Sequence, residues 1–287
     1  MVAAERLYRQ ILAAEPGHPG ALRLLGILTH QTGHDEEAIK LLGRAVTLLP
    51  ADAGCHFELG NAFYKHGRVA DAIAAYGDAI AIDPARADIH LNLGSALRAQ
   101  GESRAAIAAI RRAIELRPDY AEAHYNLGNA LQAAGDIDGA ITALRRAIAI
   151  APALTAAQFN LGTALMARSE HHAAAEAFAR VIEQRPDFAE AHFNLGNALL
   201  DVGKASKAAA AFERALALRP HWTEALCNLG NARQAEGKLT AALAAYRAAA
   251  AQDPSSFPRI VNSLAAHSTG QLWLDFAALR RDLAIDD

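Results

Sequence analysis

Two asparagines, Asn126 and Asn129, stand three residues apart in the stretch AHYNLGNAL, which spans residues 123–131. A nearly identical stretch, AHFNLGNAL, follows at residues 191–199. An asparagine amide offers one acceptor oxygen and two N–H donors, so it can pair with the N–H and C=O groups of an extended peptide backbone. Residues three apart on a helix share one face. The pattern therefore indicates hydrogen-bonded binding rather than catalysis.

The same amides recur along the chain in two phases, which we expect to form two parallel rows on one surface. The first phase comprises Asn92, Asn126, Asn160, Asn194 and Asn228. The second comprises Asn61, Asn129, Asn197 and Asn231, with Ser95 and Thr163 at the intervening positions. A single hydrogen bond contributes only about 0.5–1.5 kcal/mol, whereas ordering a disordered segment costs roughly 2–5 kcal/mol. We predict that these asparagines together bind a peptide.

The elements that must position these rows repeat every 34 residues. Leu-Gly pairs occur at 25–26, 59–60, 93–94, 127–128, 161–162, 195–196 and 229–230. Prolines keep the same step from Pro16 to Pro254, and alanines keep it from Ala38 to Ala242. Repeats of this kind cannot bury their apolar surface alone, so they stack on their neighbours.

Residues 121–154 illustrate one unit. Apolar residues at helical spacing predict two helices, and Gly135 between them supplies a left-handed stop for the first. A glycine inside a helix costs about 1 kcal/mol relative to alanine. Gly128 therefore predicts that the second helix crosses close to the backbone, with Leu144 opposite. The corresponding bulky residues are Leu42, Tyr76, Ile110, Leu144, Phe178, Phe212 and Tyr246.

This pattern of Leu-Gly, alanine, a large apolar residue, alanine and a terminal proline resembles the tetratricopeptide repeat (TPR) family. The resemblance implies an all-α, right-handed superhelical solenoid of antiparallel helix hairpins, with the first helices lining its concave surface. It divides the chain into an N-terminal half-repeat at 1–18, seven repeats within 19–256 and C-terminal capping helices at 257–287. The seven repeats are 19–52, 53–86, 87–120, 121–154, 155–188, 189–222 and 223–256.

The chain departs from the family pattern at several positions. The family often has tryptophan early in the first helix, where this chain has His56, His90, His124 and His192. Val181 replaces a small alanine, and Ser169 replaces the turn glycine. Arg233 stands where leucine or phenylalanine is usual. It either weakens the packing of the last repeat or marks an interaction there.

Both ends of the chain are expected to act as caps. Residues 1–16 fit a second helix only. At the other end, the stretch RIVNSLAAH is expected to form a closing helix. The stretch LWLDFAALRRDLA is expected to form another, capped by Asp275, with Trp273 and Phe276 covering the last repeat.

The NLGNAL units also resemble the TPR region of protein O-GlcNAc transferases and their bacterial relatives, in which such a ladder holds extended substrate peptides. The resemblance implies a protein–protein interaction module that binds a partner peptide in an asparagine-lined groove. Three alternatives stay open: amides that only fix helix stacking, a structural scaffold that self-associates through its ends, and the substrate-selecting region of a larger glycosyltransferase-like enzyme.

The charges beside the rows bear on what the groove would bind. Acidic residues recur one turn before the ladder, at Asp88, Glu122, Glu190 and Glu224. They suggest a mildly acidic edge that favours basic peptides, although acids at solvated helix starts also suit the helix dipole. The other well-known TPR mode clamps an acidic C-terminal carboxylate. Its basic residues are missing here, because Lys65 and Arg98 stand isolated.

No motif for catalysis, a metal or a cofactor is recognisable. The repeated histidines lie one repeat apart, so we interpret them as packed helix residues rather than metal ligands. Cys55 and Cys227 lie far apart without a metal-type spacing, which favours reduced core thiols. We therefore predict that this chain has no enzyme activity and no cofactor.

The bulk composition agrees with a helical binding module. Of the 287 residues, 52% are hydrophobic, and alanine fills long helix-favouring tracts. The formal net charge of −3 gives no indication of a nucleic-acid or membrane-surface partner. The absence of a signal-like start and of a long apolar run predicts a cytoplasmic protein without membrane insertion.

Overall fold

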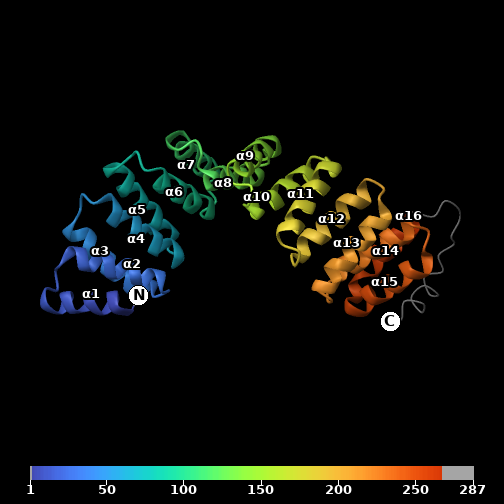
Figure 1. Ribbon diagram of the computed structural model, residues 1–287, viewed down its shortest axis with the longest axis horizontal. Helices are drawn as coiled ribbons and strands as arrows, with labels where there is room; N and C mark the ends of the chain where they lie inside the picture. The colour runs from blue at the N-terminus through green and yellow to red at the C-terminus, as the bar shows by residue number, and fades with distance from the viewer. Residues whose placement is uncertain (1, 267–287) are drawn as a thin grey trace. The chain divides into compact units, whose positions relative to one another are not determined.

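The computed structural model describes residues 2–266, and within this range the regular structure is entirely helical (Figure 1). The helices are α1 (Val2–Ala14), α2 (Pro19–Gln31), α3 (Asp35–Leu48), α4 (Ala53–Lys65), α5 (Val69–Ile82), α6 (Ala87–Ala99), α7 (Ser103–Leu116), α8 (Ala121–Ala133), α9 (Ile137–Ile150), α10 (Thr155–Ala167), α11 (His171–Gln184), α12 (Ala189–Asp201), α13 (Ala205–Leu218), α14 (Thr223–Ala235), α15 (Leu239–Gln252), the 3₁₀ helix η1 (Pro254–Ser256) and α16 (Phe257–Ala266). The expected helix containing Asp275, Trp273 and Phe276 lies outside the described residues.

The helices pair as hairpins, so the predicted repeated-hairpin architecture is confirmed. An even-numbered first helix packs against the odd-numbered second helix that follows it, from α2 with α3 to α14 with α15. The chain forms two compact units, Met1–Ala151 and the part that begins at Pro152. Within each unit, the second helix of one hairpin also contacts the first helix of the next (Figure 1). We call the two parts the N-terminal unit and the C-terminal unit.

The turn within each hairpin needs a left-handed residue. Glycine supplies it in six hairpins, with φ between 74° and 88°. Ser169 occupies the same position with φ 61°, a backbone angle that residues other than glycine seldom adopt. The substitution noted in the sequence therefore keeps the turn geometry and strains the backbone at this one residue.

The glycine inside each first helix marks the close crossing point, as predicted. A methyl group built on Gly128 would lie 2.6 Å from Cγ of Leu144, and one on Gly196 would lie 2.5 Å from Cε1 of Phe212. Real Cβ atoms do not approach other heavy atoms this closely. Leu144 and Phe212 are fully buried, so the missing side chain makes room for the core.

The repeated histidines have a structural role that their spacing alone does not reveal. Nε2 of His56, His90, His124 and His192 each lies 3.0 Å from a proline carbonyl six residues earlier. His56, His90 and His192 are also buried. Each imidazole donates to a carbonyl that the end of the preceding helix leaves without a backbone partner. The prediction that these are packed helix residues is confirmed.

Of the repeats that lack this histidine, those with Gln158 and Leu226 in its place satisfy the same carbonyl from the other helix. Nε2 of Gln184 donates to the oxygen of Pro152, and Nε2 of Gln252 donates to the oxygen of Pro220, each at 3.1 Å. Both glutamines end the second helix of their own repeat. The donor has therefore moved from the first helix to the second helix, and the bond is retained.

Arg233 marks an interaction, which is the second of the two alternatives considered for it. Its guanidinium pairs with Glu213 on α13 and, at 2.8 Å, with Glu236 at the end of α14. Lys238 lies 3.3 Å from the same Glu236 carboxylate. The Arg233 hydrogen bond lowers the pKa of Glu236 to about 2. An ion-pair network thus ties α14 to α13 at a position where five other repeats have leucine or phenylalanine.

The last described helix, α16, packs onto the final hairpin. Ile260 and Leu264 are buried in one cluster with Cys227 and Tyr246. Cys55 is buried in the N-terminal unit. Burial raises the pKa of its thiol to about 11, so both the position and the chemistry fit an unreactive core thiol.

Candidate functional site

All nine candidate asparagines lie on first helices and are half-buried. In the N-terminal unit they come from α4, α6 and α8, and in the C-terminal unit from α10, α12 and α14. Half-burial matters because these amides reach the surface without being free to move like solvated side chains. The structure places them in order as Asn61, Asn92, Asn126, Asn129, Asn160, Asn194, Asn197, Asn228 and Asn231.

Some of the amides bind each other across neighbouring repeats. Nδ2 of Asn92 donates to Oδ1 of Asn61 at 2.8 Å, and Nδ2 of Asn228 donates to Oδ1 of Asn197 at the same distance. We call these two pairs the paired rungs. Each joins the first helices of adjacent repeats, so the structural alternative accounts for these four residues.

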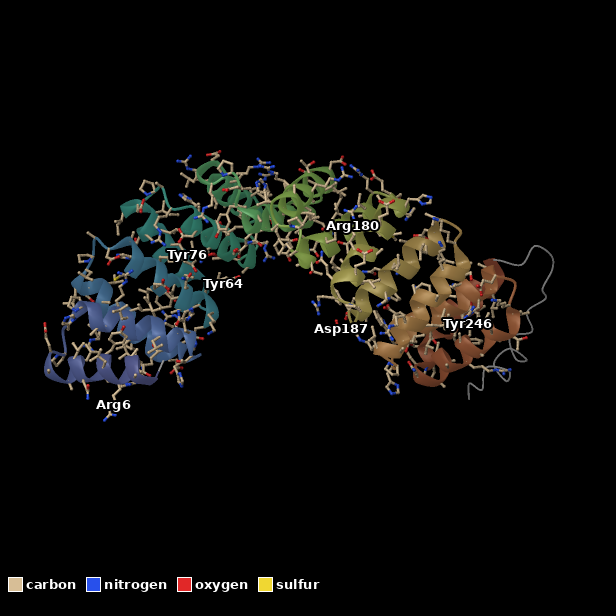
Figure 2. The ribbon with its side chains drawn as sticks, in the orientation of Figure 1. Arg6, Tyr64, Tyr76, Arg180, Asp187 and Tyr246 are labelled. Atoms are coloured by element: carbon tan, nitrogen blue, oxygen red, sulfur yellow. The ribbon has the colours of Figure 1, made fainter. Side chains whose placement is uncertain are left out.

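Two tyrosines extend this network. Figure 2 shows Tyr76 and Tyr246 among the side chains of the N-terminal and C-terminal units. The Tyr76 hydroxyl donates to Oδ1 of Asn61 at 2.8 Å, and the Tyr246 hydroxyl donates to Oδ1 of Asn231 at 2.7 Å. Burial raises the pKa of both phenols, so both remain hydrogen-bond donors. The sequence identifies these tyrosines only as core residues. Their hydroxyl groups, unlike the phenylalanine rings at the same phase, are the signal that could have shown a polar role.

Asn126 and Asn194 are different, because the residue that should accept from them has been replaced. Ser95 stands in place of the accepting asparagine in the repeat before Asn126, and Thr163 stands there before Asn194. Their hydroxyls donate instead to carbonyls of their own helices, at 3.1 Å for Ser95 and 2.8 Å for Thr163. Within residues 2–266, neither Asn126 nor Asn194 makes a side-chain hydrogen bond. We call them the unpaired amides.

A pocket of about 390 Å³ opens beside the paired rung of the N-terminal unit. Its walls come from α2, α4, α5, α6 and the start of α8. Lys65 and Arg98 both line it, together with Asn92 and Tyr64. The description of these two cations as isolated is therefore wrong. They lie one position short of a full repeat apart, so they do not recur at the same position of the repeat. The fold nevertheless places both at one pocket.

The predicted acidic edge is partly neutralised. Arg86 holds Asp88 at 2.5 Å, and Arg219 pairs with Glu190. Burial alone would raise the pKa of Asp88, but the hydrogen bond and charge of Arg86 outweigh it and lower that pKa. In the described part of the chain, Glu122 and Glu224 make no ion pair. Only two of the four acids thus keep an uncompensated charge.

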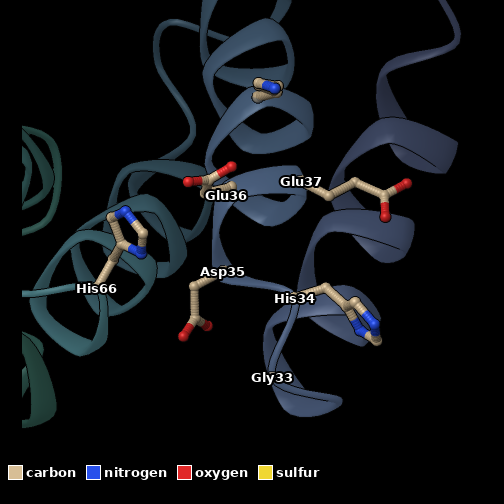
Figure 3. A pocket seen from close by; sticks show the side chains of 7 residues that line it. Gly33, His34, Asp35, Glu36, Glu37 and His66 are labelled. Atoms are coloured by element: carbon tan, nitrogen blue, oxygen red, sulfur yellow. The ribbon is translucent and has the colours of Figure 1, made fainter.

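A second pocket, of about 460 Å³, gathers acids and histidines around the turn between α2 and α3. Figure 3 shows His66 and His34 on opposite sides of Asp35, with their side chains diverging rather than facing one point. Asp35 is already bound by Nδ1 of His30 at 2.9 Å. Among residues 2–266, no group of three histidine, cysteine or acidic side chains has a geometry that could hold a metal ion.

Comparison with known proteins identifies the repeat. A tetratricopeptide repeat family model matches residues 91–154, 159–221 and 194–257. A second model of the same description matches residues 1–62, and a TPR repeat model matches residues 60–101. No curated protein matches the sequence significantly. None of the helices in the described range is both long enough and apolar enough to span a membrane.

Several solved structures share the fold. The C-terminal part of a TPR repeat-containing protein from Cytophaga hutchinsonii superposes with a TM-score of 0.70 and 15% identity, covering 83% of this chain and 98% of that one. The TPR protein YrrB gives 0.58 and 23%, covering 64% and 95%. MamA gives 0.57 and 22%, covering 65% and 97%. These identities are low, so the likeness concerns the fold, and the matching repeats show that this chain belongs to the tetratricopeptide repeat family.

Proposed function

We propose that this chain is a protein–protein interaction module that holds an extended segment of a partner along its first helices. The TPR fold suggests protein–protein interaction in general. The observation that carries the finer proposal is the pair of unpaired amides, Asn126 and Asn194. Each is half-buried on a first helix and has hydrogen-bonding capacity that nothing in residues 2–266 uses.

An unpaired amide at this position suits a peptide backbone. Its carbonyl oxygen can accept from a backbone N–H while its N–H₂ group donates to a backbone C=O. Each such bond contributes about 0.5–1.5 kcal/mol, so one amide in each unit is too weak alone. The paired rungs retain further capacity, because each uses one of the two hydrogens of Asn92 or Asn228. We infer that they supplement the unpaired amides along the same surface.

Two similarities support this mode of binding. The structure of YrrB is described as that of a TPR protein with an unusual peptide-binding site. The NLGNAL units resemble those of O-GlcNAc-transferase TPR regions, and on that resemblance alone the chain could serve as the substrate-selecting part of a larger glycosyltransferase. In either setting we propose that these residues bind and do not catalyse.

The test is to select a phage-displayed library of random peptides on the wild-type protein and to measure the affinity of the enriched peptides. The double variant Asn126→Ala/Asn194→Ala should bind them at least about tenfold more weakly, because it removes several backbone hydrogen bonds. Its thermal unfolding should match the wild type. The exposed Asn262→Ala on α16 provides a matched control that should leave affinity unchanged.

A contrasting variant, Asn92→Ala/Asn228→Ala, separates binding from stacking. Because it breaks both paired rungs, it should lower the free energy of unfolding by about 1–3 kcal/mol in total. If Asn126→Ala/Asn194→Ala destabilised the protein as much, the unpaired amides would be structural and the proposal would fail. Enrichment of no peptide at all would also overturn it.

Self-association is a second candidate, favoured by the outer face of α1. Leu7 is 53% exposed there. Beside it, Glu5, Arg6 and Arg9 line a shallow pocket of about 460 Å³. Sedimentation over a range of concentrations tests this alternative. A mass that rises with concentration in the wild type but not in Leu7→Ser would support a scaffold.

A further inference from the structure

We propose that the pocket of the N-terminal unit selects partner segments that place an acidic side chain between Lys65 and Arg98. This inference rests on the proposed function, because it specifies the partner's chemistry at one place along the same first helices. It departs from the sequence interpretation, in which the acidic edge favours basic peptides.

The pocket wall presents several unused donors. Oδ1 of Asn61 is occupied twice, by the Tyr76 hydroxyl and by Nδ2 of Asn92. The Ser95 hydroxyl donates its one hydrogen to a carbonyl of α6, so it offers the pocket no donor. What remains toward the pocket includes the second hydrogen of Asn92, the ammonium of Lys65 and the five N–H groups of Arg98. A carboxylate, which accepts and does not donate, complements such a wall.

The two cations differ in how far their charge is already used. Nζ of Lys65 donates to the carbonyl of His30 at 3.0 Å and lies 3.7 Å from the Asp35 carboxylate. Two of its hydrogens remain available, and its side chain is 48% exposed. Arg98 is exposed and makes no ion pair within residues 2–266. We infer that Arg98 supplies the main charge and that Lys65 adds a second, partly screened contact.

The charges of the pocket are unevenly distributed along the helices. Lys65 and Arg98 lie in the last turns of α4 and α6, where cations suit the negative end of the helix dipole. Glu122 lies in the first turn of α8, at the start of a helix rather than at its end, and lines the same pocket. An acidic side chain is therefore attracted to the edge formed by the helix ends and repelled from the edge formed by Glu122.

The equivalent edge of the C-terminal unit lacks these charges. The residues in phase with Arg98 are Met166, Leu200 and Gln234, and those in phase with Lys65 are Ala167, Asp201 and Ala235. The C-terminal unit offers no cation at these positions to an acidic side chain. The selection for acid is thus a property of the N-terminal unit alone.

The experiment uses peptides enriched from the random phage library on the full chain, with a matched pair of charge variants. Lys65→Ala/Arg98→Ala removes both pocket cations. Lys207→Ala/Arg214→Ala removes two exposed cations of α13 and changes the net charge equally. We expect the enriched peptides to contain aspartate or glutamate and to bind the pocket variant about tenfold more weakly, with the control variant unchanged. Raising the salt concentration should weaken binding to the wild type more than to the pocket variant.

A double-mutant cycle locates the contact. Replacing the acidic residue of the peptide by its amide should weaken binding to the wild type and have little further effect on the pocket variant. Enriched peptides without acidic residues, or equal affinities for the pocket and control variants, would overturn this inference. If those peptides still lost affinity for Asn126→Ala/Asn194→Ala, the proposed function would stand. Unchanged affinity for that amide variant would instead count against the proposed function.

Discussion

The two units build the same hairpin with different side chains. In the N-terminal unit, the residues packed against the first-helix glycines are Leu42, Tyr76, Ile110 and Leu144. In the C-terminal unit they are Phe178, Phe212 and Tyr246. There, further aromatic contacts join a first helix to the residue that caps the next first helix, with ring centroids of Phe159 and Phe188 5.0 Å apart and those of Phe193 and Trp222 4.5 Å apart.

The surfaces of the two units also differ in charge. The N-terminal unit presents Lys65 and Arg98 at the ends of its first helices, whereas the C-terminal unit has uncharged residues and an aspartate at the same phases. Each unit nevertheless contains one paired rung and one unpaired amide. The recurring glycines, turn residues and prolines therefore specify the shared fold. The residues that vary between repeats determine what each unit can bind.

The largest expected difference between the units concerns the crossing glycines. Gly196→Ala should lower the free energy of unfolding by about 1–3 kcal/mol, because the flat, fully buried Phe212 ring cannot move aside. Gly128→Ala should lose less, since Leu144 can adjust its rotamer. Gly43→Ala, in a helix position with nothing within 4 Å, should instead gain about 0.5–1 kcal/mol. Urea unfolding followed by circular dichroism measures all three. Equal losses at Gly128 and Gly196 would contradict the proposed difference in core rigidity.

A smaller effect should show that the glutamine donor of the C-terminal unit can replace the histidine donor of the N-terminal unit. His90→Leu leaves the Pro84 carbonyl without its donor and should cost about 1–3 kcal/mol. Leu116 occupies the phase of Gln184 and Gln252. Adding Leu116→Gln to His90→Leu should restore at least half of the loss. Leu116→Gln alone is the control. If it stabilised the wild type equally, the recovery would not come from the carbonyl.

The smallest expected effect is a pH dependence confined to the C-terminal unit. The pKa of Glu236 falls from 4.5 to about 2 on folding, so its carboxylate stabilises the folded chain above pH 4.5. That contribution is lost as the pH drops through the interval down to about 2. Arg233→Leu removes the main cause of the shift. Thermal unfolding should therefore show a difference between wild type and Arg233→Leu that shrinks as the solution is acidified. A constant difference across this interval would argue against the ion pair.

Much of the fold could be predicted from the sequence, because each structural position recurs in every repeat. Gly128 and Leu144 recur in phase with their equivalents, so helix pairing and the crossing point follow from spacing. The hydrogen bonds of His90 and its equivalents could not be predicted in the same way. A histidine on a helix does not reveal which carbonyl the preceding loop will turn toward it.

The candidate site was predicted as two rows that act together, and the structure separates paired from unpaired amides within the first row. The difference between Asn92 and Asn126 depends on the preceding repeat. That repeat offers Asn61 as an acceptor to Asn92, but it has Ser95 at the corresponding position before Asn126. That signal was present in the sequence, but only a comparison between neighbouring repeats gives it meaning. Lys65 and Arg98 were described as isolated for a related reason, since their place in one pocket depends on how successive helices stack.

The exchange of the proline-carbonyl donor between helices has a consequence for protein engineering. In this chain, histidine at one position and glutamine at the other satisfy the same acceptor, and each repeat discussed above uses one of the two. Position-by-position averaging of the repeats would keep the commoner residue at each site and discard this dependence. A recombined repeat that paired Leu226 of one unit with Ile150 of another would contain two individually natural residues and no donor. Chimeras of such repeats should therefore exchange the two positions together.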